Sequence, residues 1–346
     1  MANKTGSLTP NHPAKTYELR IAFHAGKVTV LEAKQRTISL LKSLGCDSFV
    51  EGAIDGLDID NEFTNEPRDF YTELGGLELP VSVYKYSREY LEDLRARISR
   101  HFDEKFPGQV TTSMHDMETS VWLEGWKESF KPLVTDRFAI YPPWDKPGDD
   151  VTAGRLLLEI EPGIAFGTGQ HATTQLCLRE LEKIAVAMGK EQVTRTSVLD
   201  VGTGTAILAL GCVKLGFGRV AGTDIDPDAV LAARNNAAMN GVKLDVAQMT
   251  VPSPAAATHL PPAFKPPFDI VVANILKVVL EKILPDLAGA VAPGGLLVMS
   301  GLLHEDARLL TRQAEGLGLA FVRESTQDDW SCLVLQNIIL SDKPSF

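Results

Sequence analysis

The chain has few cysteines, and they stand far apart among its 346 residues: Cys46, Cys177, Cys212 and Cys332. No pair has the C-x-x-C spacing that is typical of zinc ligands or redox-active thiols. The spacing therefore predicts no metal site and no disulfide framework. Four separate thiols are typical of a protein in a reducing compartment.

Long apolar runs are also missing. No stretch reaches the ~18 apolar residues of a membrane-spanning helix. The N-terminal stretch lacks the apolar core of a signal peptide. We therefore expect a cytoplasmic protein with no membrane partner, and we expect residues 1–15 to be disordered.

Basic residues are outnumbered, with 34 Lys and Arg against 45 Asp and Glu, a net charge of -11. Binding to nucleic acid phosphates requires a basic face, so we expect no direct nucleic-acid partner. An acidic surface would suit a basic protein instead. The chain is long enough for two domains, since a domain usually holds ~100–200 residues.

Residues 16–117 have the pattern of a small α+β domain. Alternating apolar residues in Tyr17–Phe23 predict a strand, and helical spacing follows in Leu31–Gly45. Two strand-like stretches, a charged helix with Ser87 as N-cap, and a last edge strand come next. The order β-α-β-β-α-β is that of a ferredoxin-like domain, a fold that by itself indicates no function.

Residues 118–154 are expected to form a linker with a tryptophan-rich helix. Trp122, Trp126 and Phe130 are spaced by four and so share one helix face. Packing against a neighbouring domain explains these aromatics better than stacking on a ligand does.

In residues 155–346 strands alternate with helices, which predicts an α/β domain with a parallel sheet covered on both faces. One strand ends at Asp224 and another at Asn274, and the last two strands suggest a closing antiparallel pair. The proline- and alanine-rich stretch 251–267 is expected to be an inserted loop.

Glycines and polar residues stand at three strand ends: Gly202 with Gly204, Asp224, and Asn274. Ligands of doubly wound sheets bind at this edge, and a carboxylate there can accept hydrogen bonds from ribose. The pattern predicts a nucleoside ligand, although tight packing of a helix on the sheet would explain the glycines alone. Ile207 stands where a dinucleotide fingerprint has its third glycine, so the identity of the nucleoside stays open.

A G-x-G loop after "VLD", followed by a strand that ends in an acid, resembles S-adenosylmethionine-dependent methyltransferases. Together with "VWLEGWKESFKP", "PGIAFGTGQHATT" and "DIVVANIL" it is similar to one family, PrmA, the methyltransferase of large-subunit ribosomal protein eleven. The resemblance is strong from Val121 to Gly301, and "DDWSCLVL" continues it. The resemblance implies a Rossmann-like class I catalytic domain with S-adenosylmethionine as cofactor. It also implies a ferredoxin-like substrate-recognition domain that precedes the catalytic domain in the sequence. The expected reaction is methylation of lysine or N-terminal amino groups of that ribosomal protein, and we expect a monomer.

The resemblance also implies site residues. Those matched to cofactor binding are Thr174, Gly202, Gly204, Asp224 and Asn274, together with Phe166 and Gly167 upstream, and Asn274 is also the candidate catalytic residue. Two positions depart from the family pattern: Ala172 often is proline there, and Ala206 commonly is glycine. The methyl of Ala206 is tolerable at the start of a right-handed helix but not at positive φ.

Methyl transfer to an amine requires a neutral nitrogen aligned with the activated methyl group. The neutral amide of Asn274 can accept a hydrogen bond from the N–H of the amine without raising the pKa of the amine. A carboxylate in the same place would raise that pKa. No general base is evident, because His171 is expected to cap or pack, Asp200 to bond the glycine loop, and Asp226 to be an N-cap. The glycines of "EPGIAFGTGQHATT" predict a flexible cover over the methionine end of the cofactor.

Other functions remain open at this point. The chain could methylate another protein or a small-molecule amine, or it could be a non-catalytic nucleoside-binding module. The joint presence of Thr174, Gly202, Asp224 and Asn274 favours an enzyme.

Overall fold

The computed structural model describes residues 13–24, 26–44, 46, 49–51, 80–119, 130–163 and 165–338. The described residues up to Thr119 belong to one compact unit, and those from Phe130 belong to a second, larger unit. Lys15, in the range expected to be disordered, already begins a strand. Residues 1–12 and the tryptophans Trp122 and Trp126 lie outside the described residues.

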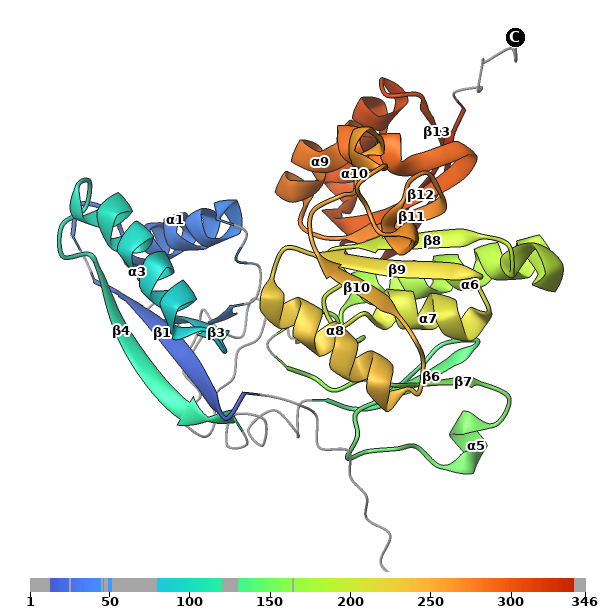
Figure 1. Cartoon of the computed structure of the whole chain (residues 1–346). Helices are drawn as coiled ribbons and strands as arrows, with labels where there is room; N and C mark the ends of the chain where they lie inside the picture. The colour runs from blue at the N-terminus through green and yellow to red at the C-terminus, as the bar shows by residue number, and fades with distance from the viewer. Residues whose placement is uncertain are drawn as a thin grey trace, which may run out of the picture. The chain divides into compact units, whose positions relative to one another are not determined.

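The smaller unit contains a four-stranded antiparallel sheet with helices α1 and α3 on one face (Figure 1). Its elements are β1 (Lys15–Phe23), α1 (Val30–Ser43), β2 (Val50–Glu51), β3 (Val81–Lys85), α3 (Arg88–Asp103) and β4 (Val110–Glu118). The sheet order is β2-β3-β1-β4, so β4 is the predicted edge strand. Leu19, Ile21 and Ile98 share the core. Ser87 caps α3, because its hydroxyl accepts from the Tyr90 N–H at 3.2 Å.

The larger unit is built on a seven-stranded sheet of order β10-β9-β8-β11-β12-β14-β13. The strands are β8 (Ser197–Val201), β9 (Arg219–Asp224), β10 (Asp245–Gln248), β11 (Phe268–Asn274), β12 (Val291–Leu303), β13 (Leu319–Gln327) and β14 (Trp330–Asn337). The first five in this order pair in parallel, and β14 is antiparallel to both of its neighbours. The predicted parallel sheet and the closing antiparallel pair are therefore confirmed.

Helices cover both faces of this sheet, as the alternation of strands and helices predicted. One core packs α6 (Ala172–Val193), α7 (Ile207–Leu215) and α8 (Pro227–Met239) on the first face. A second core packs α9 (Lys277–Ala290) and α10 (His304–Glu315) on the other face. The site edge of the sheet is thereby held between two hydrophobic layers.

A three-stranded sheet forms a further layer, with β5 (Leu133–Val134), β6 (Phe138–Tyr141) and β7 (Leu156–Glu159). A short helix, α5 (Asp149–Thr152), joins β6 to β7. Strands β5 and β6 fall inside the range expected to be a linker, yet Phe138 and Ile140 share a core with α6 and α7. The physical reason is that α7, "ILALGCVKL", is apolar on nearly all sides, so a second layer is needed to bury it.

The proline- and alanine-rich stretch between β10 and β11 is a loop, as predicted, with two short 3-10 turns, η3 (Pro254–Ala256) and η4 (Pro262–Phe264). Phe264 is buried in the core shared with α9. The guanidinium of Arg219 donates to the carbonyl oxygens of Pro262, Lys265 and Pro267 at 3.0–3.2 Å. The loop is therefore attached to the start of β9, at the opposite edge of the sheet from the strand ends singled out above.

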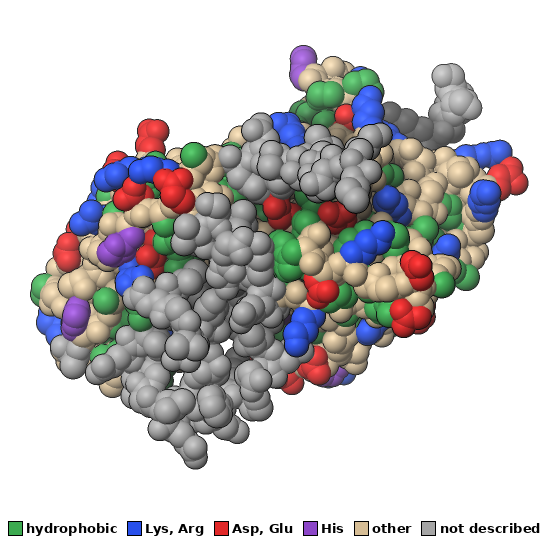
Figure 2. Space-filling view, turned by 90° about the horizontal axis from the view of Figure 1, so that it is seen from below, with side chains coloured by type: hydrophobic (Ala, Val, Ile, Leu, Met, Phe, Trp, Pro, Cys, Tyr) green, Lys and Arg blue, Asp and Glu red, His purple; other side chains and the backbone are tan. Residues whose placement is uncertain are grey.

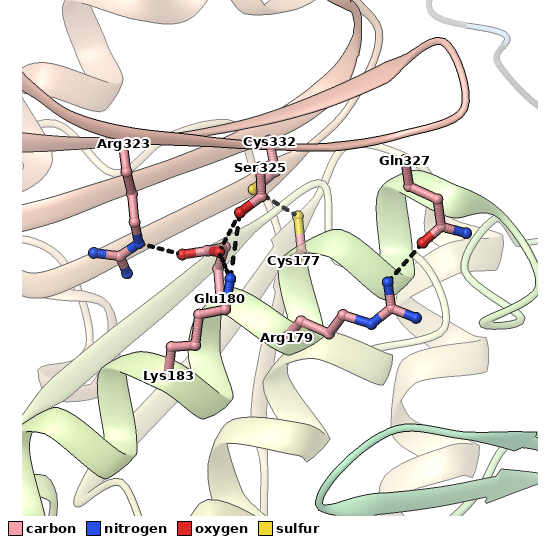
Figure 3. A network of polar contacts seen from close by, with 8 residues as sticks. All are labelled: Cys177, Arg179, Glu180, Lys183, Arg323, Ser325, Gln327 and Cys332. Atoms are coloured by element: carbon pink, nitrogen blue, oxygen red, sulfur yellow. Dashed lines mark hydrogen bonds and ion pairs between the residues drawn. The ribbon is translucent and has the colours of Figure 1, made fainter.

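Helix α6 is fastened to strand β13 through the buried carboxylate of Glu180 (Figure 3). It accepts from Arg323 Nε at 2.6 Å, from the Ser325 hydroxyl at 2.6 Å and from Lys183 Nζ at 2.7 Å. Burial pushes the pKa of Glu180 upward, but these hydrogen bonds together outweigh it and leave the pKa below its usual value. The helix that begins beside the site therefore has one defined register against the C-terminal hairpin.

On the face shown in Figure 2, acidic and basic side chains are interspersed over the described part of each unit. Among the described residues, no helix combines the length and apolarity needed to cross a membrane. The same residues contain no group of three or more side chains placed to hold a metal ion.

Candidate functional site

The three predicted strand ends meet at one edge of the larger sheet. Strand β8 lies between β9 and β11, and Val201 is paired with Thr223 on one side and Ala273 on the other. The residues that follow these three in the chain are Gly202, Asp224 and Asn274, respectively. Because the three strands are parallel, these residues end at the same level, and the structure brings the candidates together.

The glycine loop after β8 is bound to the end of β9. The N–H groups of Gly202 and Thr203 both donate to the Thr223 carbonyl, at 2.8 and 2.9 Å. Gly204 N–H donates to Asp224 Oδ2 at 3.0 Å, and Asp226 N–H donates to Oδ1 at 2.9 Å. A carboxylate has about four acceptor positions, so these two bonds are compatible with further bonds from ribose hydroxyls.

Asp226 is the N-cap of α8, as predicted, because its side chain accepts from the Asp228 N–H at 3.0 Å. Ile225 lies between the two carboxylates in the sequence, and 54% of its surface is exposed. An exposed isoleucine beside a ribose-binding carboxylate offers an apolar surface to a nucleoside base. The sequence analysis missed this residue, since a single isoleucine gives no periodic signal.

Ala206 departs from the conformation that its methyl group would favour. It lies in the left-handed region, with φ 65° and ψ 20°, at the N-cap of α7, and it is fully buried. A non-glycine residue in this region costs roughly 1–2 kcal/mol. The structure therefore places the alanine at positive φ, the conformation in which the extra methyl was expected not to be tolerated.

The upstream segment contacts the glycine loop directly. The Phe166 carbonyl accepts from the Thr205 N–H at 2.9 Å, and the Gly167 carbonyl accepts from the Thr205 hydroxyl at 2.5 Å. A Cβ on Gly204 would lie 2.2 Å from the Phe166 carbonyl oxygen, so glycine is required for this close approach. Residues 165–171, the cover segment, are thus hydrogen-bonded to the glycine loop. The expectation of a flexible cover did not foresee these hydrogen bonds.

Thr174 and Asn274 form a buried pair, with 0% and 8% of their surfaces exposed. The Asn274 Nδ2 donates to the Thr174 hydroxyl oxygen at 3.2 Å. The Asn274 Oδ1 is buried and has no hydrogen-bond partner among the described residues. Because an unpaired buried carbonyl is costly, this oxygen is a candidate acceptor for an amino group.

His171 is the N-cap of α6, which confirms the capping prediction. Its Nδ1 accepts from the Thr173 N–H at 3.3 Å and lies 2.8 Å from the Thr173 hydroxyl. Burial lowers the pKa of His171 to about 4. The imidazole is therefore neutral near pH ~7, and its ring packs edge to face against Phe166 and Trp330.

Asp200 lies beneath the glycine loop and is fully buried. Its Oδ2 accepts from the Thr203 hydroxyl at 2.7 Å and from the Ala209 N–H at 3.1 Å. Burial raises the pKa of Asp200 to about 7, against the lowering effect of those two bonds. Asp200 thus binds the loop through a hydroxyl and binds the backbone of α7, which is close to its predicted role.

Two further residues escaped the sequence analysis. Thr205 contacts the cover segment, and Asn236 of α8 donates to the Thr205 carbonyl at 2.9 Å. Asn236 also accepts from the Glu161 N–H at 2.9 Å. A single asparagine within a helix has no distinctive sequence pattern, so only the fold shows which backbone groups its side chain binds.

The arrangement fits the cofactor implied by the resemblance. A strand-end carboxylate suits a ribose, Ile225 suits a base, and the unpaired Oδ1 of Asn274 suits an amino group. The described residues hold no competing metal cluster. A nucleoside cofactor beside an acceptor amine matches this set of groups.

Comparison with known proteins gives the same family. The model of the ribosomal protein L11 methyltransferase (PrmA) family matches residues 25–338. The ribosomal protein L11 methyltransferase of Geobacter metallireducens is 36% identical over 307 residues, covering 84% of this chain and 92% of that protein. The one from Geobacter sulfurreducens is 37% identical over 313 residues, covering 86% and 94%.

A solved structure agrees. The crystal structure of ribosomal protein L11 methylase from Lactobacillus delbrueckii subsp. bulgaricus is 28% identical, with a TM-score of 0.52, and it aligns over 60% of this chain and 99% of that chain. The resemblance drawn from the motifs is therefore confirmed. Since the family model spans most of the chain and both relatives align over most of their length, the chain belongs to the ribosomal protein L11 methyltransferase (PrmA) family.

Proposed function

We propose that this chain transfers methyl groups from S-adenosylmethionine to amino groups of ribosomal protein L11, at a lysine side chain, the N-terminal amine or both. The observation that carries the proposal is the buried Oδ1 of Asn274, which has no partner among the residues that the structure describes. It lies at the sheet edge where Gly202 and Asp224 also stand. The name shared by the relatives, ribosomal protein L11 methyltransferase, supports the substrate.

The cofactor is proposed to lie between the glycine loop and the cover segment. The residues proposed to hold it are Thr174, Gly202, Gly204, Asp224, Asn274, Phe166 and Gly167. Asp224 would accept ribose hydroxyls, and exposed Ile225 would face the base. S-adenosylmethionine supplies a methyl group that its sulfonium already activates. The chain therefore has to align the acceptor amine and exclude competing nucleophiles, and alignment can contribute up to ~7–11 kcal/mol.

Asn274 is proposed to hold the acceptor amine through its Oδ1. An amine must be neutral to act as a nucleophile, whereas a free lysine has a pKa near ~10.4. A carboxylate at this place would raise that pKa further, but an amide accepts the N–H bond without adding charge. The bond from Asn274 Nδ2 to Thr174 keeps the amide from rotating, so Oδ1 stays directed to one side.

The two units are proposed to divide the work. The larger unit would be a Rossmann-like class I methyltransferase domain, and the smaller one a ferredoxin-like domain that recognises the substrate protein. The order β-α-β-β-α-β and the sheet order β2-β3-β1-β4 support the second assignment. We further propose a cytoplasmic monomer that has no direct contact with nucleic acid; the net charge of -11 supports the last of these points alone.

Incubation with methyl-labelled S-adenosylmethionine and ribosomal protein L11 tests the proposal. The wild-type chain should label L11. The Asn274→Ala variant should still bind the cofactor but should label L11 at least ~10-fold more slowly. Label on a different protein in a cell extract, with none on L11, would show that the substrate assignment is wrong. Cofactor binding without transfer to any acceptor would identify a nucleoside-binding module instead.

A further inference from the structure

The two glycine-containing segments are joined by one residue that the family resemblance does not single out, Thr205. All three of its polar groups are used. Its N–H donates to the Phe166 carbonyl at 2.9 Å, and its hydroxyl donates to the Gly167 carbonyl at 2.5 Å. Its own carbonyl accepts from Asn236 Nδ2 at 2.9 Å. Thr205 is fully buried, so these bonds form where water does not compete.

The contact depends on the absence of side chains on both segments. A Cβ on Gly167 would lie 2.8 Å from the Thr205 hydroxyl oxygen, and a Cβ on Gly204 would lie 2.2 Å from the Phe166 carbonyl oxygen. Gly167 also has φ +107°, a conformation that other residues rarely adopt. Glycine on each side therefore lets the Thr205 hydroxyl reach the opposite backbone.

Asn236 extends the connection to the residues that lead into the cover segment. Its Oδ1 accepts from the Glu161 N–H at 2.9 Å while its Nδ2 binds the Thr205 carbonyl. Asn236 is 1% exposed, and its backbone belongs to α8, which starts three residues after Asp224. The cover segment is thus attached near its start through Thr205, and the chain before it is attached through Asn236.

We propose that Thr205 is a positioning residue for the cofactor, which sets the separation of the cover segment from the glycine loop and thereby the affinity for S-adenosylmethionine. The inference rests on the proposed function, since it assumes that the cofactor contacts both segments. Without the hydroxyl, the Gly167 carbonyl loses its donor, and the cover segment samples positions that bind the ligand less well. A site whose two walls are fixed before binding loses less conformational entropy when the ligand enters.

Thr205→Val and Thr205→Ser separate the hydroxyl from the packing of the side chain. Valine has the shape of threonine but cannot donate, whereas serine keeps the donor and loses one methyl group. Thr205→Val should raise the Kd for S-adenosylmethionine, measured by calorimetry, by about 5- to 10-fold. At saturating cofactor its kcat should stay within about twofold, because Asn274 keeps its place. Thr205→Ser should stay within about twofold of wild type in both Kd and KM.

Hydrogen exchange in the absence of cofactor provides a readout that does not depend on activity. Backbone amides of the cover segment should exchange faster in Thr205→Val than in wild type or Thr205→Ser. Gly167→Ala, which crowds the same hydroxyl from the other side, should raise the cofactor Kd in the same way. In the double variant that also carries Thr205→Val, the increase in the cofactor Kd should be much smaller than the two single increases combined.

The outcomes are distinguishable. Unchanged Kd in Thr205→Val, with tight binding by the wild type, would overturn the inference and leave the proposed function intact. A higher cofactor Kd in Thr205→Ser but not in Thr205→Val would overturn it too, because it would show that packing of the methyl group, rather than the hydroxyl, matters. If Thr205→Val does not fold, Gly167→Ala still tests the contact, and an unchanged cofactor Kd in that variant would count against the inference. No binding of S-adenosylmethionine by the wild type would overturn the proposed function itself.

Discussion

The Thr174 hydroxyl accepts a hydrogen bond from the Asn274 amide at 3.2 Å, across 100 positions of sequence. It joins the first turn of α6 to the end of β11, inside a buried environment. Two candidate residues that were chosen separately from the motifs therefore act on one another. In this arrangement Asn274 Nδ2 donates to the protein, and Oδ1 is left to accept from a ligand.

Thr174→Val should lower kcat about 5- to 10-fold, because the Asn274 amide loses the acceptor that orients it. Valine keeps the buried shape, so the melting temperature should change by only a few degrees. Steady-state kinetics with saturating cofactor measure the effect. In an Asn274→Ala background the same substitution should have almost no further effect on kcat. A full second loss there would mean that Thr174 acts independently of Asn274.

Ala206→Gly should change the free energy of unfolding by less than about 1 kcal/mol. Relief of the left-handed conformation, roughly 1–2 kcal/mol, offsets the loss of a buried methyl and the added freedom of glycine in the unfolded chain. The matched control is Ala233→Gly, which removes an equally buried methyl from the interior of α8. That variant should lose about 2 kcal/mol in urea unfolding. Equal losses in the two variants would contradict the strain at Ala206.

Asp200→Asn should make the stability of the protein less dependent on pH. The folded pKa of Asp200 is raised to about 7, so its contribution to stability is fully present below its unfolded pKa of ~3.9 and is lost as the pH rises through 7. Asparagine does not ionise. Its advantage in unfolding free energy over wild type should therefore grow by about 2–3 kcal/mol between about pH 5 and about pH 8, at 1.36 kcal/mol per unit. Denaturant titrations at both pH values measure this, and a constant difference would count against a raised pKa.

Glu180→Gln should destabilise the larger unit by about 2–4 kcal/mol, because it removes the charge that three donors from α6 and β13 share. Glu191→Gln on the same helix is the control. Glu191 pairs with Arg195 at 2.8 Å, but its side chain is 84% exposed, so its loss should cost less than about 0.5 kcal/mol. Thermal unfolding of both variants provides the comparison. Similar melting temperatures would mean that the Glu180 network does not stabilise α6 against the hairpin.

Local signals predicted much of the fold. The N-caps Ser87, His171 and Asp226 are where the sequence placed them, because capping depends on residues two or three positions apart. The strand ends at Asp224 and Asn274 are also confirmed, since buried strands of apolar residues stop where polar residues begin. The roles of Thr174, Gly202, Gly204, Asp224, Asn274, Phe166 and Gly167 toward a cofactor remain predictions.

Other features had no local signal. The strands β5 and β6 are short, four residues or fewer, and they lie in the range that was assigned to a linker. The second partner of β6, the strand β7, follows only after the segment that contains α5. The positive φ of Ala206 was not predicted, since alanine disfavours that conformation and only the connection from the glycine loop to α7 imposes it. In both cases a tertiary requirement outweighed the preference of the residues themselves.

The sequence by itself determined most of the order of strands and helices, the three caps named above and the positions of the chemical groups at strand ends, because each depends on neighbours along the chain. Only the tertiary structure decided that Thr205 binds the cover segment 38 positions upstream, that Asn274 binds Thr174, and that Asn274 Oδ1 is left without a partner among the described residues. Hydrogen bonds between segments that are distant in the sequence depend on how the sheet brings those segments together. The periodicity and spacing of residues along the chain do not contain this information.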